Sequence, residues 1–538
     1  QRAAVDQIEG PLLVVAGPGT GKTQLLSARV AHILEMTDAL PQNILCLTFT
    51  ENGAANMRER LSRFIGKAAY DVQISTYHGF GSEIISSYGQ YFLGDRLQQP
   101  IDTIGRYRLV HDILEGLSYR DPLRFTEPRD VISTISDIKR GLLTSEDIRG
   151  IVAENDQTMK VVNDRLAHIF ADFTRMPTKL DKALPYFTST LQALAEAAPQ
   201  EPINQAYGSV VVIAAHELKL AIEAAEDMGK GKPLTAWKNA WLEKDLDNAF
   251  VLKGTFANKK LASMADVMDV YQRKLKEQGL YDFDDMILRP IQAIKQHDDL
   301  RYSLQEKYLY ILLDEYQDTN RAQAELVHLL ADNPVHEGRP NIMAVGDDDQ
   351  AIYAFQGAQY SNMLDFYRAF RDTSVINLTD NYRSHADILS VGSFIARQIN
   401  ERVFSEFDGA TKEIVAANAS LTTAHVERRD FRSDIAEYAW VSERIAELIA
   451  SGTNPNEIAV LAPKHKYLEA AAPLLAKAGV PVRYERSEDV LKTPLIRQVV
   501  TLARLLVAIK ADNGSAEQYW PEALSFPFWE LPTALVWQ

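Results

Sequence analysis

A glycine-rich turn near the start of the chain constrains the fold more than any other feature. Residues Leu12 to Ala16 form an apolar run that suits a buried parallel strand, and helical periodicity follows from Lys22 to Met36. The turn between them has the spacing of a phosphate-binding P-loop with alanine in the first glycine position. It reads Ala16-Gly17-Pro18-Gly19-Thr20-Gly21-Lys22-Thr23. A strand, a glycine-rich turn and a helix in this order predict an α/β domain with a parallel sheet.

The residue types of this turn fit a nucleotide. Its glycines allow backbone N–H groups to converge on phosphate oxygens, and the N-terminus of the following helix adds the positive end of its dipole. Lys22 would reach the β- and γ-phosphates, and Thr23 would hold Mg²⁺. We therefore expect residues 16–23 to bind ATP together with Mg²⁺.

A second pattern supplies carboxylates for the same chemistry. The apolar run that starts at Tyr310 ends in Asp314 and Glu315. Ligands of open α/β sheets bind at the carboxyl ends of the strands, so these two side chains are expected beside the P-loop. Asp314 would hold Mg²⁺, and Glu315 would orient or deprotonate the attacking water.

The texture of the chain predicts its domains. Short apolar runs alternate with helical patterns over residues 1–80 and 284–370, which indicates a doubly wound α/β domain. Residues 81–283 are dominated by helical periodicity and are expected to form a helical insertion domain. Residues 371–511 are assigned to a further α/β region, with strands at Val375–Leu378, Glu457–Leu461 and Val480–Tyr484, and residues 512–538 differ from it in being rich in Trp and Pro.

Composition limits the surface charge, the disulfide bonding and the membrane association that the chain can have. The net charge of −16 excludes a wholly basic surface but allows a local basic groove for nucleic acid. The single cysteine, Cys46, cannot form an internal disulfide or a cysteine cluster for zinc, which fits the cytoplasm. No apolar run is long enough to cross a membrane, and no secretory signal pattern is present, so we expect no membrane association.

Beyond the P-loop, the string Asp314-Glu315-Tyr316-Gln317-Asp318-Thr319-Asn320 resembles motif II of the UvrD/Rep/PcrA-type superfamily 1 DNA helicases. Other blocks follow in the order of that family. They are Gln1-Arg2-Ala3-Ala4-Val5 (Q motif), Thr48-Phe49-Thr50-Glu51-Asn52 (motif Ia), Thr76-Tyr77-His78-Gly79, Gly346-Asp347-Asp348-Asp349-Gln350 (motif III), Asn381-Tyr382-Arg383-Ser384 (motif IV) and Ile458-Ala459-Val460-Leu461.

The resemblance implies a RecA-like first motor domain at 1–80 and 284–370, the first part of a second at 371–511 and the start of a second accessory domain at 512–538. It also implies roles for individual residues. Gln1 would recognise adenine, Tyr382 would stack on it, and Arg383 would touch the γ-phosphate. Gln350 would couple the γ-phosphate to the DNA track. Single-stranded DNA, including the strands at duplex junctions, would be contacted by Thr48, Phe49, Thr50, Tyr77, His78, Tyr353 and Phe355. Stacking of bases on aromatic rings tolerates any sequence, as a translocating motor requires.

The chain also departs from the family pattern. Phe355-Gln356-Gly357 stands where the family usually has Trp-Arg-Gly, and Gln24 stands where several relatives have Arg. Motifs V and VI, the latter with a second arginine finger, are not found in these 538 residues. We expect the gene product to begin before Gln1 and to continue beyond Gln538. We also expect this piece to bind ATP and single-stranded DNA but to hydrolyse ATP slowly.

Three functions remain open. The first is an ATP-dependent 3′-to-5′ DNA helicase or translocase of DNA repair, replication or recombination. The second is a P-loop ATPase of another class, such as a transporter or partition ATPase, against which the aromatic residues of the DNA blocks count. The third is a non-enzymatic binding or regulatory piece. Stimulation of ATP hydrolysis by DNA distinguishes the three, and the sequence identifies no protein partner.

Overall fold

The computed structural model describes residues 1–92, 99–173, 175–177, 179–200, 208–245, 247–352, 362–399, 413–421, 424–484, 493–511 and 514–532. The chain divides into two compact units, residues 1–426 and residues 427–538. Within the described ranges, no helix is both long and apolar enough to span a membrane.

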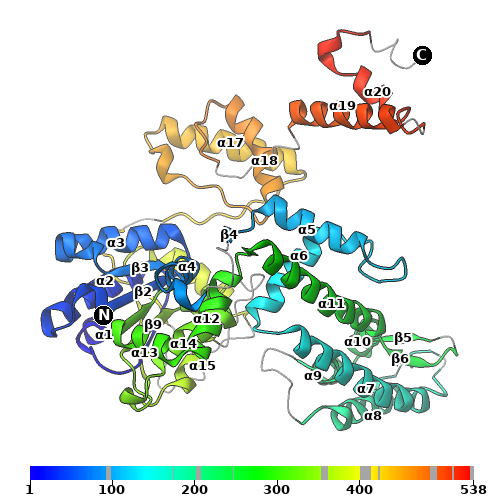
Figure 1. Ribbon diagram of the computed structural model, residues 1–538, viewed down its shortest axis with the longest axis horizontal. Helices are drawn as coiled ribbons and strands as arrows, with labels where there is room; N and C mark the ends of the chain where they lie inside the picture. The colour runs from blue at the N-terminus through cyan, green and yellow to red at the C-terminus, as the bar shows by residue number, and fades with distance from the viewer. Residues whose placement is uncertain are drawn as a thin grey trace. The chain divides into compact units, whose positions relative to one another are not determined.

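A six-stranded parallel sheet forms the centre of the first unit (Figure 1). Its strand order is β10-β1-β9-β8-β2-β3. The strands are β1 (Leu12–Ala16), β2 (Ile44–Thr48), β3 (Gln73–Thr76), β8 (Tyr310–Leu313), β9 (Ile342–Gly346) and β10 (Ser374–Leu378). Every neighbouring pair is parallel, which confirms the predicted fold class.

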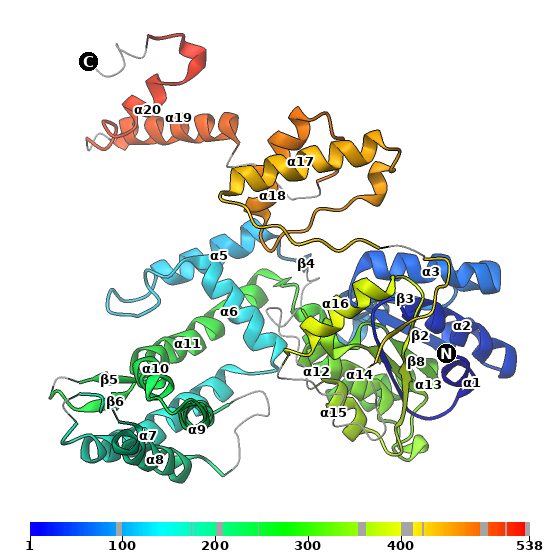
Figure 2. The ribbon, with the colours of Figure 1, turned by 180° about the vertical axis from the view of Figure 1, so that it is seen from behind.

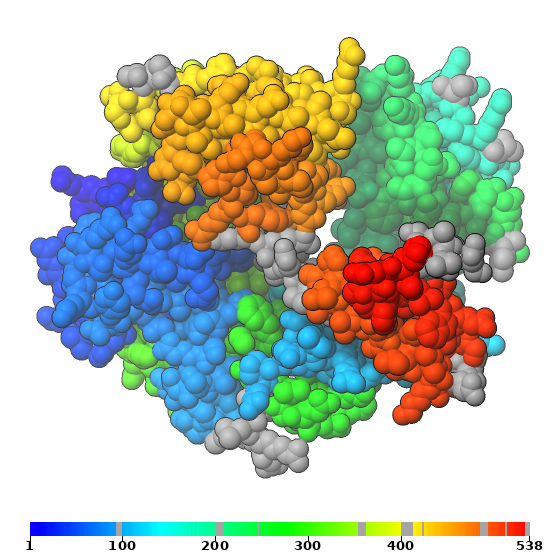
Figure 3. Space-filling view, turned by 90° about the horizontal axis from the view of Figure 1, so that it is seen from above, coloured from blue at the N-terminus to red at the C-terminus, as the bar shows by residue number. Residues whose placement is uncertain are grey.

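Both faces of this sheet are covered by helices, which explains why its central strands are continuous apolar runs. Side chains alternate between the faces, so Leu13 and Val15 enter one core while Leu12 and Val14 enter the other. One face packs against α4 (Tyr77–Ser87), α12 (Asp285–Gln296), α13 (Asp298–Lys307), α14 (Arg321–Ala331) and α15 (Asn362–Ala369), and the other against α1 (Arg2–Asp6), α2 (Lys22–Met36) and α3 (Glu51–Ile65). Figure 2 shows these layers from behind. The blue atoms of Figure 3 belong to the N-terminal part of this domain.

The segment between β3 and β8 is mostly helical. It contains α5 (Thr103–Glu115), α6 (Pro128–Arg140), α7 (Ser145–Ile169), α8 (Leu180–Ala197), α9 (Val210–Met228), α10 (Lys232–Trp241) and α11 (Thr255–Gln278). The strand pairs are short: β4 (Gln99–Pro100) with β7 (Leu280–Tyr281), and β5 (Leu242–Lys244) with β6 (Phe250–Leu252). Two hydrophobic cores hold it together, one around Val131 and Tyr271 and the other around Phe187 and Trp237.

The region assigned to a second motor domain differs from the expectation. Strand β10, expected in that domain, pairs with β1 and completes the first sheet. It is followed by the small pair β11 (Asp380–Asn381) and β12 (Val415–Ala416), and by α16 (Ala386–Ala396). The described part of the second unit contains α17 (Asp434–Ala450), α18 (His465–Lys477), α19 (Pro494–Ala511) and α20 (Trp520–Leu524), and no strand.

The runs expected as strands at 457–461 and 480–484 therefore lack strand pairing in the described residues. A strand is stabilised by hydrogen bonds to a neighbouring strand, and the described part of this unit offers none. The apolar residues of these two runs predict strands from local sequence, whereas strand pairing depends on a neighbouring strand in the folded structure.

Candidate nucleotide and DNA site

The parallel sheet brings the predicted site residues to one edge. All six strands point the same way, so the segments that follow them meet at their carboxyl ends. The P-loop follows β1, Phe49 follows β2, and His78 follows β3. Asp314 and Glu315 follow β8, and the segment Asp347–Gln350 follows β9. Residues far apart in the sequence thus lie at one edge of the sheet.

The P-loop connects β1 directly to α2, whose first residue is Lys22. Gly19 and Gly21 have φ angles of 68° and 88°, in the left-handed region that glycine adopts without steric cost. The Thr20 hydroxyl donates to Gly17 O at 2.8 Å and closes the turn. The 15-residue helix α2 presents its N-terminus to this loop, with no acidic residue in its first turn. This geometry suits an anion such as a phosphate group.

Lys22 and the two carboxylates of β8 meet beside the loop. Lys22 is 9% exposed, and its Nζ lies 2.8 Å from Glu315 Oε2. Asp314 is 5% exposed; burial, followed by the charge of Glu315, raises the pKa of its carboxyl to about 6. Burial also opposes ionisation of Glu315, but the charge of Lys22 and a hydrogen bond from Gln317 outweigh it and lower the pKa. Glu315 is therefore ionised beside Lys22.

The segment after β10 reaches the P-loop. The Asn381 side chain donates to Pro18 O, and Tyr382 N–H donates to Gly19 O at 3.0 Å. Asn381 Oδ1 in turn accepts from Arg383 N and Ser384 N, each at 2.8 Å. The side chains of Tyr382 and Arg383 are exposed beside the loop. Sequence reasoning assigns no role to Asn381, whose amide joins the two segments.

Gln1 and Ile414 also lie against the P-loop. Gln1 Nε2 donates to Thr20 O at 2.6 Å. A Cβ on Gly17 would lie 2.5 Å from Ile414 Cδ1, so the Ile414 side chain covers that glycine. Ile414 belongs to no recognised motif, and it lies almost 400 positions after the P-loop, next to β12. The short parallel pairing of β11 with β12 brings it there.

The predicted DNA residues have different environments. Thr48 is buried at the end of β2, Thr50 is exposed and caps α3 by accepting from Gly53 N at 3.0 Å, and Phe49 is partly buried between them. His78 stacks on Phe283, with ring centroids 3.9 Å apart. Tyr353 and Phe355 lie outside the described residues.

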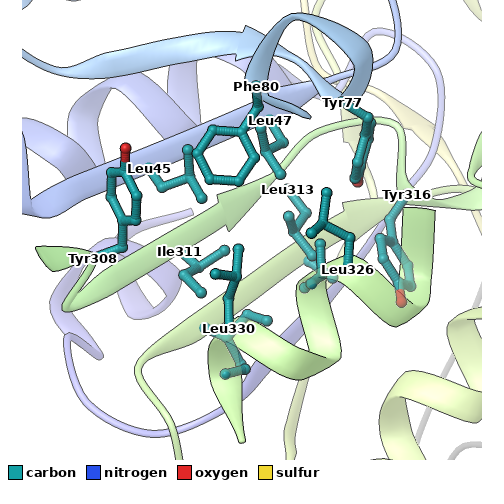
Figure 4. Packing of buried hydrophobic residues seen from close by; sticks show 14 of the residues in the cluster. Leu45, Leu47, Tyr77, Phe80, Tyr308, Ile311, Leu313, Tyr316, Leu326 and Leu330 are labelled. Atoms are coloured by element: carbon teal, nitrogen blue, oxygen red, sulfur yellow. The ribbon is translucent and has the colours of Figure 1, made fainter. Parts of the chain in front are cut away.

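Tyr77 is a core residue in this structure. Its side chain is 1% exposed and packs in the cluster that includes Leu47, Leu313 and Tyr316 (Figure 4). A ring enclosed in this way presents no face on which a base can stack. The sequence prediction of a DNA contact by Tyr77 is therefore corrected to a packing role at the start of α4, because the residue faces the sheet rather than the site edge.

The site residues fit Mg²⁺ held together with a nucleotide. Mg²⁺ prefers oxygen ligands and is usually bound by one or two carboxylates with substrate phosphates and water. Thr23, in the first turn of α2, and Asp314 provide a hydroxyl and a carboxylate. Among the described residues, no group of three or more His, Cys, Asp or Glu side chains could hold a metal ion by itself. A metal here would therefore depend on the phosphates for its remaining ligands.

Comparison with known families accounts for nearly the whole chain. A family model for the UvrD/REP helicase N-terminal domain matches residues 1–371, and one for the UvrD-like helicase C-terminal domain matches residues 376–520. The chain is 27% identical to the ATP-dependent DNA helicase PcrA of Staphylococcus epidermidis over 461 residues, which cover 86% of this chain and 47% of that protein.

Two further relatives match the chain with similar identity and coverage. PcrA of Leuconostoc citreum is 27% identical over 404 residues, or 75% of this chain and 39% of the relative. PcrA of Staphylococcus aureus is 26% identical over 461 residues, or 86% of this chain and 47% of the relative. The chain spans about half or less of the length of these relatives.

Proposed function

Because this chain belongs to the UvrD/REP helicase family, we propose that it is the nucleotide- and DNA-binding part of an ATP-dependent DNA helicase or translocase. The observation that carries the proposal is the pairing of Lys22 with Glu315 next to Asp314, at the edge where the P-loop and the other strand ends meet. A P-loop lysine, a magnesium-binding aspartate and a neighbouring glutamate are the groups that ATP hydrolysis requires.

Each group has one task in this mechanism. The backbone of the loop from Ala16 to Thr20 cradles the phosphates, and Lys22 moves from Glu315 to the β- and γ-phosphates when they bind. Glu315, released from that ion pair, accepts a proton from the attacking water. Thr23 and Asp314 would hold Mg²⁺, which would supply positive charge against the phosphates. Arg383, exposed beside the loop, adds positive charge at the γ-phosphate.

The base of ATP is recognised at the other end of the loop. Gln1 reads the adenine edge and Tyr382 stacks on the ring. The hydrogen bond between Gln1 and Thr20, together with the one between Tyr382 and Gly19, supports this assignment because both residues are already held against the loop. Stacking and edge recognition together favour adenine over a phosphate-only ligand.

Single-stranded DNA is the proposed track, bound without sequence preference. Phe49, Tyr353 and Phe355 stack on bases, while Thr50 and His78 contact the strand at the same edge of the sheet; Thr48, which is buried, supports this edge from the end of β2. We propose 3′-to-5′ movement, as the family resemblance implies. Displacement of streptavidin from the 3′- or the 5′-end of a biotinylated strand measures this polarity. The pathway is repair, replication or recombination, in the cytoplasm.

Residues 1–538 should bind their ligands more readily than they turn ATP over. Binding depends mainly on the P-loop domain, whereas hydrolysis also needs charge from the second motor domain, and an arginine finger contributes about 10³–10⁵ to the rate of phosphoryl transfer. Motif VI, which supplies such an arginine in the family, is not found in these residues. We therefore propose slow hydrolysis for this piece.

The test is linked binding of nucleotide and DNA. Fluorescence anisotropy measures the affinity of the chain for a labelled oligo-dT strand, with and without a non-hydrolysable ATP analogue and Mg²⁺. The proposal predicts that the strand binds and that the analogue changes its affinity. A chain that binds the analogue but no single-stranded DNA would instead be a P-loop ATPase of another class.

A further inference from the structure

A buried glutamine next to the catalytic carboxylates has partners on two motifs. Gln317 is 2% exposed and lies in the short helical turn η4 (Tyr316–Asp318) that follows Glu315. Its Nε2 donates to Glu315 Oε2 at 2.9 Å and to Asp318 Oδ2 at 3.3 Å. Its Oε1 accepts from the backbone N–H of Asp347 at 3.0 Å. The amide thus uses its donor towards the nucleotide site and its acceptor towards the segment that follows β9.

The chain of hydrogen bonds continues to Gln350. Asp347 is fully buried at the end of β9, and its carboxylate accepts from the Gln350 side chain. Gln350 N–H also donates to Asp347 O at 2.9 Å. Glu315, Gln317, Asp347 and Gln350 therefore form one continuous path. Because buried polar groups need partners, a change at one end of such a path has a cost at the other.

The packing around Gln317 is close. A Cβ on Gly346 would lie 2.8 Å from Gln317 Oε1 and 3.3 Å from Gln317 N, so the end of β9 touches the glutamine directly. The position needs a donor at one end and an acceptor at the other. Glutamate lacks the donor, and methionine lacks both while keeping a similar length.

In the proposed mechanism, nucleotide binding changes the hydrogen bonds of Glu315, which is one end of this path. Glu315 Oε2 accepts from both Lys22 at 2.8 Å and Gln317 at 2.9 Å. In the proposed mechanism Lys22 turns to the phosphates, which leaves Gln317 as the side chain that orients Glu315. A movement of Glu315 towards the γ-phosphate would then shift the Gln317 amide, which is hydrogen-bonded to Asp347 N.

We propose that Gln317 is a positioning residue that links the nucleotide site to the Asp347–Gln350 segment, so that nucleotide and single-stranded DNA alter each other's affinity through it. The inference rests on the proposed function, in which Glu315 acts at ATP, and on the role that the family resemblance implies for Gln350, which would couple the γ-phosphate to the DNA track. Linkage between two ligands is reciprocal, so the effect can be measured from either side.

The experiment compares Gln317→Met with a matched control, Gln305→Met, in the full 538-residue chain. Gln305 is also 2% exposed, and its Nε2 donates to Leu329 O at 2.8 Å and Asp332 O at 3.0 Å, away from the site edge. Both variants remove a buried amide from the same domain. Only Gln317→Met removes the link, and thermal melting confirms that each variant is folded.

The quantity measured is the ratio of oligo-dT affinities with and without the non-hydrolysable ATP analogue. Allosteric linkage typically gives a ratio of about 5–150-fold. The ratio should fall close to one in Gln317→Met and should keep the wild-type value in Gln305→Met. A folded Gln317→Met with the full wild-type ratio would overturn the inference.

Two further measurements keep the test decisive. If Gln317→Met does not fold, Gln317→Glu serves instead, because it keeps the acceptor for Asp347 and loses the donor to Glu315; the ratio should again fall. Combining either variant with Gln350→Ala should reduce the ratio no further than the larger single effect, whereas additive effects would contradict a shared path. A wild-type ratio well above one that Gln317→Met retains overturns this inference alone. A wild-type chain that binds neither ligand, or binds both with a ratio of one, contradicts the proposed function as well.

Discussion

Replacing Lys22 with methionine removes the central charge of the proposed nucleotide site while keeping the length of the side chain. Lys22 is buried at the start of α2, and Glu315 is the anion its ammonium contacts in the described structure. The Glu315 side chain is partly exposed, so water can take the place of the lost partner. We therefore expect the variant to fold.

The effect on nucleotide affinity is larger. A hydrogen bond to a charged group contributes about 1.5–3 kcal/mol, which corresponds to about a 10- to 100-fold change in affinity. The loss should lie towards the upper end, because Glu315 and Asp314 would then face the phosphates without the ammonium that compensates them. The remaining affinity comes from the backbone of the P-loop and the N-terminus of α2.

Equilibrium titration with a fluorescent ATP analogue measures this loss, in parallel with thermal melting. Lys67→Met is the matched control, since Lys67 lies exposed in the turn η2 (Gly66–Tyr70). We expect wild-type affinity for that variant and weakened binding for Lys22→Met. Unchanged nucleotide affinity in a folded Lys22→Met would refute the assignment of residues 16–23 as a P-loop.

Three further predictions concern the carboxylates, a histidine and the DNA. Glu315→Gln should keep or increase nucleotide affinity, because it removes a negative charge near the phosphates, and should abolish hydrolysis; equal loss of both in titration and ATPase assays would indicate a structural role. Burial lowers the pKa of His78 to about 4, so the folded state binds fewer protons and loses stability as pH falls from about 6.5 towards 4. Between pH 7 and pH 5 the free energy of unfolding should fall by up to about 2 kcal/mol because of this histidine. Urea unfolding at each pH measures that loss, which should be smaller in His78→Phe. Equal losses in the wild type and in His78→Phe would contradict this explanation. Oligo-dT affinity should fall with salt, and Phe355→Ala should weaken it without changing the salt slope, since stacking releases no counterions; an altered slope would argue against stacking.

Much of the site can be predicted because it depends on local patterns delivered by a regular sheet. Lys22 and Glu315 are 293 positions apart, yet each follows an apolar strand, and parallel strands deliver their following residues to one edge. The same logic predicts the region of Gln350. Gln317 belongs to motif II, but its role cannot be predicted from the sequence, because only the structure places its amide between two strand ends.

Other expectations fail where tertiary contacts decide. The apolar run of β10 predicts a strand of the second motor domain, but strand order is set by packing across the whole chain, and the strand pairs with β1. The motif around Tyr77 predicts a DNA contact, although its side chain fills the core beneath α4. Ile414 carries no sequence signal at all, since its position depends on the two-residue pairing of β11 with β12.

The most direct test of the central claim is the steady-state rate of ATP hydrolysis with and without single-stranded DNA, with the rate of Glu315→Gln subtracted as background. The account predicts a slow rate that rises when oligo-dT is added and saturates with the same concentration dependence as DNA binding. A rate above background that does not respond to DNA at any concentration would contradict an ATP-driven DNA motor.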